Sequence, residues 1–403
     1  MNKAIDKYLK VYAEHEVNQF DSFPVDISFK HAVVIPAYKE SSDFIERFVS
    51  SKLAEQESLM ILVINQPESE TSNLAQTRLF KSAVALGAIV WQSGELSLVK
   101  VKGKSACLLL VDRFNRPIPE KQGVGLARKI GVDLALAMVH KNILASSWIH
   151  SSDADAHLPH DYFSATAKVS NAAVAACFNF THLSDNQAIH KANQEYERAL
   201  RYFLAGLDYA ESGYAFFTIG SILVFEATAY AKVRGFPKRS AGEDFYLLNK
   251  LAKLGRVDFL PDTKVTLDAR ISDRVPFGTG PAVGKILTLN QQGLEYHYYH
   301  PLTFHLLKEC LKAFQSLWQY REQLENWLAL QSDELSAVLT ELDINAFVTK
   351  HHASSQIQFN KQLKVWFDAF KTLKFIHAAR DNFYPDLPLE QAMRQASFYN
   401  AIG

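Results

Sequence analysis

Short apolar segments alternate with segments of helical length from residue 31 to about residue 270, and this alternation restricts the fold more than any other feature. Residues 31–36 and 59–64 are continuous apolar runs that end at a proline or shortly before one, which is typical of strands buried on both faces of a parallel sheet. Helical segments follow at about 44–53 and 72–86, and the next strand is expected at 88–91. This order predicts an α/β fold with a doubly wound mixed sheet, right-handed crossovers and flanking helices.

The same alternation continues to residue 267, and a purely helical pattern begins at about Pro301. The further strands and helices are expected at 106–111, 123–141, 147–151, 173–180, 187–207, 227–233, 243–254, 257–260 and 265–267. A cluster of glycine and proline at 276–284 predicts either a linker or a mobile lid. We therefore predict three parts, which are a helical lead-in, an α/β domain and a helical region, at 1–30, 31–285 and 286–403.

The composition excludes some classes of function. Lys plus Arg and Asp plus Glu both number 43, which argues against attraction to nucleic acid through overall charge. The three cysteines lack metal-ligand spacing and suit a reducing compartment. The charged N-terminus shows no signal peptide, and the most apolar stretch, 214–231, contains polar residues that favour a core segment over a membrane span. These features predict a soluble, cytoplasmic protein.

Two carboxylates, Asp153 and Asp155, stand one residue apart directly after the strand expected at 147–151. Ligands of parallel sheets bind beyond the carboxyl ends of the strands. Mg²⁺ and Mn²⁺ prefer oxygen ligands from a few carboxylates together with substrate phosphates. The pair is therefore a candidate metal site that grips a diphosphate, although an ordinary Asx turn in which Asp155 caps a helix explains the same residues.

A second acidic pair, Glu243 and Asp244, opens the helix expected at 243–254. Acidic residues in the first turn are favoured by the helix dipole, which explains the pair without any function. In the functional alternative, this pair is catalytic, and Asp244 is a general base that deprotonates an acceptor hydroxyl.

Glycines also mark the start of the helix expected at 123–141, where exposed amide groups attract phosphate. Gly125 would permit close approach of a diphosphate, and Arg128 and Lys129 could add charge-assisted contacts to it. A plain helix start with a solvated basic face is the alternative. The glycine spacing matches neither a dinucleotide fingerprint nor a P-loop.

In their order along the chain, these motifs resemble the family-2 glycosyltransferases with the GT-A fold. The resemblance consists of five short segments, each generic by itself. They are 33–40 (VVIPAYKE), 125–131 (GLARKIG), Asp153-Ala154-Asp155, Gly220-Ser221 with Gly235-Phe236, and Gly242-Glu243-Asp244. The C-terminal helical region lies outside the resemblance.

The resemblance implies a GT-A domain, a nucleotide-diphosphate sugar as donor, and Mn²⁺ or Mg²⁺ held by Asp153 and Asp155. It implies that Asp244 takes the proton of the acceptor, so that the acceptor oxygen displaces the diphosphate with inversion. The implied donor-binding residues lie after the first two strands, at the glycine-rich helix start, in the acidic motif and in a later loop. They are Pro36, Tyr38, Glu40, Asn65, Gly125, Arg128, Lys129, Asp153 and Arg274.

The chain also departs from the family pattern. The family usually carries acidic residues after its second strand to help read the nucleobase, whereas this chain has residues 65–67 (NQP), so the base stays open. The Gln-x-x-Arg-Trp signature of the processive synthases is absent, which favours addition of a single sugar. Residues 270–274 form either a lid that clamps the diphosphate or a surface linker. His297 or His300 could donate a third metal ligand, although ordinary surface or core positions are commoner.

Other functions remain open. A phosphatase of the haloacid-dehalogenase kind also uses Asp-x-Asp after a buried strand, with the first Asp as nucleophile, but it places the motif on its earliest strand. A sugar nucleotidyltransferase would need a glycine- and arginine-rich loop where this chain has residues 37–40 (AYKE). A non-catalytic nucleotide-sugar binder is the third alternative. The helical tail could supply acceptor contacts, a homodimer interface or a foothold on a membrane surface.

Overall fold

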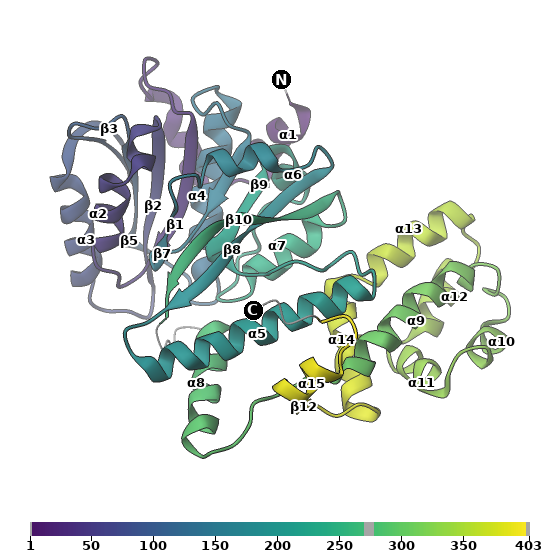
Figure 1. The fold of residues 1–403 in the computed structure, drawn as a ribbon. Helices are drawn as coiled ribbons and strands as arrows, with labels where there is room; N and C mark the ends of the chain where they lie inside the picture. Colours follow the sequence, from purple (N-terminus) through teal and green to yellow (C-terminus); the bar gives the residue numbers. More distant parts are fainter. Residues whose placement is uncertain (1, 270–277, 400–403) are drawn as a thin grey trace. The chain divides into compact units, whose positions relative to one another are not determined.

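The computed structural model describes residues 2–269 and 278–399, and their packing divides the chain into two compact units (Figure 1). The first unit comprises Met1–His190 and Thr218–Pro281, and the second comprises Lys191–Phe217 and Ala282–Gly403. The lead-in at 1–30 belongs to the first unit. The sequence-based division differs for residues 191–217, which it places in the α/β domain although they pack with the C-terminal helices.

One mixed sheet forms the centre of the first unit, with the spatial order β3-β4-β5-β2-β1-β6-β9-β8-β10-β7. β5, β2, β1 and β6 run parallel to one another, β3 and β4 form an antiparallel edge, and β9 runs antiparallel to both β6 and β8. The strands are β1 (His31–Ala37), β2 (Ser58–Pro67), β3 (Gly87–Ser93), β4 (Leu96–Val101), β5 (Cys107–Ile118), β6 (Trp148–Ser151), β7 (Ala156–His157), β8 (Ala173–Leu183), β9 (Leu223–Glu226) and β10 (Arg256–Asp268).

Helices flank this sheet. They are α1 (Lys3–Val11), α2 (Asp43–Ser50), α3 (Leu74–Ala85), α4 (Gly123–His140), α6 (Ala227–Lys232) and α7 (Glu243–Leu251), with the 3-10 turns η1 (His15–Ser22), η2 (Lys52–Glu55), η3 (Ser164–Lys168) and η4 (Gly220–Ile222). The predicted α/β fold, with a mixed sheet, flanking helices and a helical C-terminal part, is therefore confirmed.

The central strands are buried on both faces, as their continuous apolar runs predict. Gly131 of α4 lies so close to Val34 of β1 that an added Cβ would stand 2.4 Å from its Cγ1. The next residue along β1, Ile35, lies with Phe44 and Phe48 of α2 around a small cavity. Because neighbouring residues of a strand point to opposite faces, α4 and α2 cover different faces of the sheet.

The structure corrects the predicted strands in two places. The sequence pattern did not predict β4, which pairs with β3 as an antiparallel hairpin across a turn at Gly94, where φ is 54°. The strands expected at 257–260 and 265–267 are one strand, β10, whose register with β8 shifts between Leu260 and Lys264. The hydrogen-bonded pairing of β10 with β8 is therefore interrupted between the two apolar segments, but the strand itself continues through the interruption.

The second unit is helical apart from the two-stranded sheet β11–β12, which confirms the predicted helical tail. Its elements are α5 (Gln187–Tyr209), α8 (Thr279–Gln291), β11 (His297–Tyr298), α9 (Pro301–Leu317), α10 (Leu324–Ala329), α11 (Asp333–Glu341), α12 (Ile344–His351), α13 (Gln356–Trp366), α14 (Ala369–Asn382), β12 (Leu387–Pro388) and α15 (Leu389–Gln395). Part of the glycine and proline cluster at 276–284 lies outside the described residues, and from Thr279 onward the cluster begins α8 rather than a linker.

The core of the second unit explains why residues 191–217 belong to it. Gly206 of α5 lies so close to Phe304 of α9 that an added Cβ would stand 2.5 Å from the ring. Tyr202 and Leu207 of α5 are buried in the same apolar cluster as Leu307 of α9. Across the described residues of both units, no helix combines the length and the apolar character that crossing a bilayer requires.

Candidate functional site

The carboxyl ends of the parallel strands β1, β2 and β6 meet at one edge of the sheet, where ligands of such sheets bind. β6 leads directly into the acidic motif. The Ser152 amide donates a hydrogen bond to the carbonyl oxygen of Val34 at 3.0 Å, which keeps the chain beside β1. The next side chain, that of Asp153, is 32% exposed. Asp153 therefore stands at the end of a buried strand, as the sequence pattern predicts.

Arg128 of α4 contacts the acidic motif and the start of α7 at the same time. Its guanidinium donates hydrogen bonds to the Ser151 hydroxyl at 2.9 Å, the Ser152 carbonyl at 3.0 Å and Asp153 Oδ1 at 2.5 Å. Its Nε donates to Glu243 Oε1 at 2.9 Å. Arg128 and Glu243 are both buried, and each is the ion-pair partner of the other, which offsets the cost of burying their charges.

These contacts bear on the role expected for Arg128. Its side chain is only 3% exposed, and its donors are directed at protein groups that include Asp153, so the contact with a diphosphate stays a prediction. Burial alone would lower the pKa of this guanidinium, but the carboxylates of Asp153 and Glu243 outweigh burial and hold the pKa above its usual value. Arg128 is therefore a permanent charge between the two acidic motifs.

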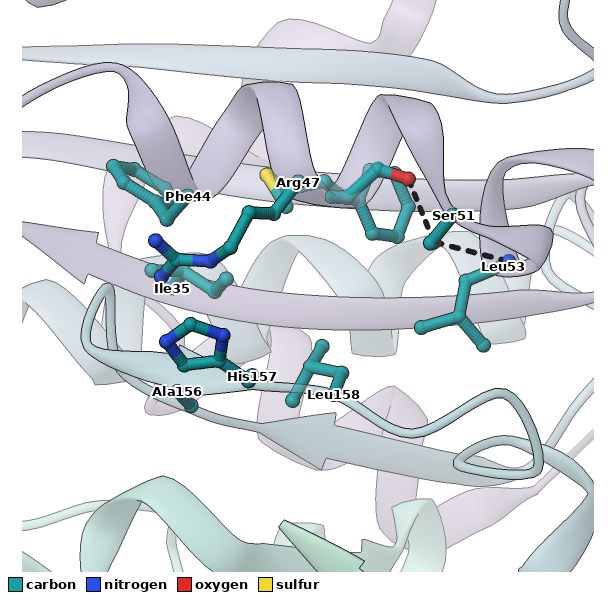
Figure 2. Close-up of a pocket in the computed structure, with 10 residues that line it drawn as sticks. Ile35, Phe44, Arg47, Ser51, Leu53, Ala156, His157 and Leu158 are labelled. Carbon is teal, nitrogen blue, oxygen red and sulfur yellow. Dashed lines mark hydrogen bonds between the residues drawn. The ribbon is translucent and has the colours of Figure 1, made fainter. Parts of the chain in front are cut away.

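Arg47 of α2 contacts the acidic motif from the other face of the sheet. Its Nη2 donates to the carbonyl oxygen of Ala154 at 3.1 Å. The Asp268 amide, at the end of β10, donates to the carbonyl oxygen of Asp155 at 2.9 Å. Figure 2 shows the Arg47 guanidinium directed toward His157, whose Nε2 lies 2.7 Å from Asp268 Oδ1. The backbone of the motif is thus fixed by contacts from both faces.

Gly242 sets the direction of the second acidic pair. Its φ of 70° lies in the left-handed region that favours glycine, and α7 begins at the next residue. Glu243 pairs with Arg128, whereas Asp244 accepts a hydrogen bond from the amide of Phe245 at 2.7 Å. Burial, followed by the like charge of Glu243, raises the pKa of Asp244 to about 7.

Asp244 and Asp153 belong to one cluster of charges. Arg128 lowers the pKa of Asp244 and Asp153 raises it, so both charges act on this carboxyl. Within the predicted catalytic pair, Glu243 forms an ion pair with Arg128, and a catalytic role for it stays a prediction. Asp244 has the pKa that suits a general base working near neutral pH.

The glycine-rich start of α4 packs against protein backbone. The Gly125 amide donates to the carbonyl oxygen of Arg239 at 2.9 Å, and a Cβ at Gly125 would stand 2.5 Å from the carbonyl oxygen of Pro237. Lys129 is 4% exposed, and its ammonium lies 2.7 Å from Asp133 Oδ2. Loop packing and an internal ion pair occupy these groups of Gly125 and Lys129, and their contact with a diphosphate stays a prediction.

The residues expected to face the nucleotide lie at the ends of β1 and β2, near the same edge of the sheet. Pro36 is buried within β1, and Tyr38 and Glu40 are half-buried beyond it. The Tyr38 hydroxyl donates to Glu70 Oε2 at 2.9 Å. Asn65 is buried at the end of β2.

Sequence reasoning did not single out Gln66, which follows Asn65. It is buried, and its Nε2 donates to the carbonyl oxygen of Glu70 at 2.9 Å. Its Oε1 is also buried and has no hydrogen-bond partner among the described residues. Buried polar atoms are almost always paired, so this acceptor marks a place for a water molecule or a ligand donor. Arg47, Ser151 and Ser152 were likewise not predicted, since only long-range contacts give them a role.

Three further predicted ligands, Arg274, His297 and His300, stay predictions. Arg274 and the candidate lid at 270–274 lie outside the described residues. His300 accepts a hydrogen bond from the Leu302 amide at 3.1 Å as the N-cap of α9, and His297 lies in β11, both in the second unit. Within the described part of the chain, no three or more His, Cys, Asp or Glu side chains are grouped to hold a metal ion.

The donor set of the acidic motif still fits one kind of cation. Asp153 and Asp155 are half-exposed carboxylates, and one oxygen of Asp153 is bonded to Arg128. Mg²⁺ and Mn²⁺ at phosphate sites often take only one or two carboxylates and complete their shell with phosphate oxygens and water. The motif suits a cation bound together with a diphosphate, and it does not suit one that side chains alone enclose.

The sequence matches no protein-family model and no curated protein. Among solved structures it is similar to S. aureus TarS 1-349 in complex with UDP-GlcNAc, at 9% identity and a TM-score of 0.39, over 84% of this chain and 91% of that chain. The complex of TarS 1-349 with UDP matches at 11% identity and a TM-score of 0.36, over 92% and 93%. The crystal structure of a mycobacterial protein matches at 14% identity and a TM-score of 0.32, over 67% of this chain and 79% of that chain. Likenesses this distant assign no function.

Proposed function

We propose that this protein is a glycosyltransferase that moves a hexosyl group from a nucleoside diphosphate to an acceptor hydroxyl. One observation carries the proposal. Arg128 hydrogen-bonds both Asp153 and Glu243, the neighbour of Asp244, at the edge of the sheet where ligands of parallel sheets bind. Asp244 has a pKa of about 7, which suits proton removal, and Asp153 is suited to holding a cation against a diphosphate. These are the two tasks that such a transfer requires.

Asp244 acts on the acceptor. Its carboxylate accepts the proton of the acceptor hydroxyl while the acceptor oxygen forms a bond to the anomeric carbon of the sugar. The bond between that carbon and the diphosphate oxygen breaks, and its electron pair leaves with the nucleoside diphosphate. Because the acceptor enters opposite the leaving group, the configuration at the anomeric carbon inverts. A base with a pKa near the working pH is the most effective one for this step.

Asp153 and Asp155 would hold Mn²⁺ or Mg²⁺ beside the diphosphate, where the cation supplies charge neutralisation to the leaving group. Arg128 orients Asp153 through a charge-assisted hydrogen bond, which is how supporting residues fix ligating carboxylates. Arg47 holds the intervening carbonyl of Ala154. The unpaired Oε1 of Gln66 offers an acceptor for an N–H of the nucleobase at the neighbouring strand end.

The first test is a screen of UDP-, GDP- and dTDP-sugars with Mn²⁺ by thermal shift, because a ligand that binds only the folded state raises its stability. The donor that is found is then used to compare variants for donor affinity and for release of nucleoside diphosphate. Asp244→Asn should keep donor binding and lose turnover by about 10²- to 10⁴-fold. Asp155→Ala and Asp153→Asn should weaken Mn²⁺-dependent donor binding by roughly 10- to 100-fold.

Asp262→Asn is the matched control, because Asp262 is 70% exposed in the same unit and pairs with the surface residue Lys168. It should behave as the unaltered protein does. Retained turnover in Asp244→Asn would remove this residue from its assigned role. Release of inorganic phosphate would point to a phosphatase, and donor binding without any turnover would leave a binding protein.

A further inference from the structure

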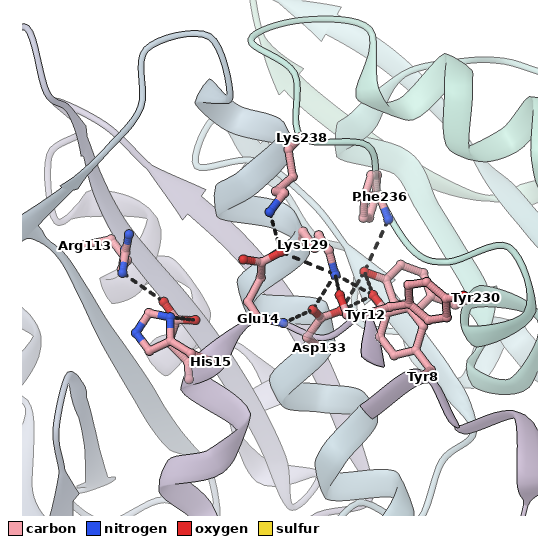
Figure 3. A network of polar contacts seen from close by, with 11 residues as sticks. Tyr8, Tyr12, Glu14, His15, Arg113, Lys129, Asp133, Tyr230, Phe236 and Lys238 are labelled. Atoms are coloured by element: carbon pink, nitrogen blue, oxygen red, sulfur yellow. Dashed lines mark hydrogen bonds and ion pairs between the residues drawn. The ribbon is translucent and has the colours of Figure 1, made fainter. Parts of the chain in front are cut away.

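A buried polar network joins the N-terminal segment to α4 and α6 (Figure 3). Its four side chains are almost completely buried and take no direct part in the proposed chemistry. They are Tyr8 of α1, Lys129 and Asp133 of α4, and Tyr230 of α6. Burying a charge is costly unless it is paired and hydrogen-bonded, so the geometry of such a network is tightly specified.

Lys129 and Asp133 form the centre of the network. The three N–H donors of the Lys129 ammonium reach Tyr8 Oη at 2.7 Å, Asp133 Oδ2 at 2.7 Å and the carbonyl oxygen of Tyr12 at 2.8 Å. Asp133 Oδ1 accepts from the Tyr8 hydroxyl at 2.6 Å and from the Tyr230 hydroxyl at 3.0 Å. Both charges and both hydroxyls are therefore satisfied within the network.

The network also fixes the beginning of the loop at 235–242, which leads into α7. An added Cβ at Gly235 would stand 2.2 Å from Tyr8 Oη and 2.7 Å from Tyr230 Oη, so both hydroxyls lie directly against this backbone position. Gly235 has a φ of 69°, which also favours glycine there. The Phe236 amide, one residue on, donates to Tyr230 Oη at 3.4 Å.

Two further contacts hold the middle and the end of this loop. Lys238 Nζ lies 3.2 Å from Glu14 Oε1, and the Glu14 amide donates to Asp133 Oδ2 at 2.9 Å. Gly123 of α4 lies so close to Ser240 that an added Cβ would stand 2.7 Å from its Cα. Beyond Ser240 the loop ends, and α7 begins with the acidic pair.

We propose that four network residues position Asp244, namely Tyr8, Lys129, Asp133 and Tyr230, and that the N-terminal segment thereby completes the site. This inference rests on the proposed function, since it assigns the network to the base of that reaction. Arg128 and Lys129 are adjacent in α4. Lys129 donates a hydrogen bond to Tyr8, whose hydroxyl lies against Gly235 at the start of the loop. Arg128 pairs with Glu243, directly after the end of the loop. A shift of the loop relative to Asp153 would therefore break at least one of these contacts.

Stability alone does not require charges at this place. Replacing a buried ion pair with apolar residues of similar volume often leaves stability unchanged or raises it. Hydrogen bonds to charged groups are directional, and they fix geometry in a way that apolar packing does not. Precise placement matters for catalysis, because a shift of about 1 Å can reduce a rate by roughly 100-fold.

The test compares Tyr8→Phe and Tyr230→Phe with Tyr12→Phe. Tyr12 contacts the network through its backbone carbonyl, which accepts from Lys129, and through its ring beside Tyr8, and Tyr12→Phe keeps both contacts. Hydrogen–deuterium exchange should become faster at residues 235–246 in the two test variants and stay unchanged in the control. With the donor identified above, kcat should fall by about 10- to 100-fold while donor affinity stays constant. The acidic limb of the pH–kcat profile should move to lower pH as Asp244 becomes more exposed.

A double variant, Lys129→Met with Asp133→Leu, covers the case in which single variants fold poorly, because it removes the charge pair without leaving either charge alone. It should show the same faster exchange and reduced kcat. Unchanged exchange at 235–246, or faster exchange with unchanged kcat, would overturn the inference. Faster exchange throughout the first unit would show a general structural role instead, which also overturns it. If the unaltered protein turns over no donor, the proposed function fails, whereas the exchange measurement still decides whether the network orders the loop.

Discussion

Arg128 is the residue on which the acidic side chains of the site depend. Arg128→Met would leave Glu243 buried without a partner, and removing one member of a buried ion pair typically costs about 3–5 kcal/mol. We expect the urea midpoint of the first unit to fall accordingly, as measured by circular dichroism. Adding Glu243→Met should recover much of the loss, since the double variant buries no lone charge. A single variant as stable as the original chain would contradict the ion pair.

The pKa of Asp244 predicts opposite effects of pH on stability and on activity. Its folded-state pKa, about 7, lies above the unfolded value, about 3.9, so the stabilisation from the protonated carboxyl is complete below about pH 4 and is lost as pH rises to about 7. Asp244→Asn mimics the protonated form. It should match the original chain at pH 4 and exceed its stability at pH 8 by roughly 1–3 kcal/mol after allowance for partial exposure.

Turnover should follow the opposite trend, because the base must be ionised, and kcat should rise through about pH 7. Thermal denaturation of both proteins at several pH values tests the stability effect, and a pH–rate profile tests the catalytic one. A stability difference that does not change between pH 4 and pH 8 would show that the Asp244 carboxyl titrates normally.

At the scale of elements, the site depends on how closely α4 approaches the loop before α7. Gly125→Ala would place a Cβ 2.5 Å from the Pro237 carbonyl oxygen and 2.6 Å from that of Arg239, so the loop would have to move. We expect a loss of about 1–3 kcal/mol by urea denaturation, together with reduced turnover. Gly284→Ala is the control, because Gly284 also lies in a helix, but among the described residues no atom beyond its own helix backbone and chain neighbours lies within 4 Å of an added Cβ. It should be neutral or stabilise by up to about 1 kcal/mol.

At the scale of the whole molecule, the chain passes from the first unit to the second within α5, between His190 and Lys191. A chain cut after residue 285, at the boundary predicted from sequence, would keep α5 and remove the helices that bury Tyr202 and Leu207. We expect this fragment to bind an apolar dye and to aggregate in size-exclusion chromatography. The same fragment with Tyr202→Gln and Leu207→Gln should be more soluble. A monomeric fragment without dye binding would contradict the assignment of 191–217 to the second unit.

Much of the fold follows from local patterns in the sequence. The apolar runs of β1 and β2, the helix that starts at Gly123 and the helical tail are all predicted by periodicity, because burial on one or both faces requires a regular spacing of apolar residues. The hairpin strand β4 was missed, since its pairing depends on a turn at Gly94 rather than on an apolar run of its own. The position of Asp153 after a buried strand is also a local property.

The partners of the site residues were decided by tertiary structure alone. From sequence, Arg128, Lys129 and Gly125 form one basic, glycine-rich helix start that could bind phosphate. In the folded chain each has a different distant partner, since Arg128 pairs with Glu243, Lys129 donates to Tyr8, and the Gly125 amide donates to Arg239, all more than 100 residues away in sequence. The raised pKa of Asp244 has the same origin, because burial and the charges around it exist only after folding. Spacing along the chain determines which residues share a helix or strand, whereas charge pairing and solvent exclusion depend on segments that only packing brings together.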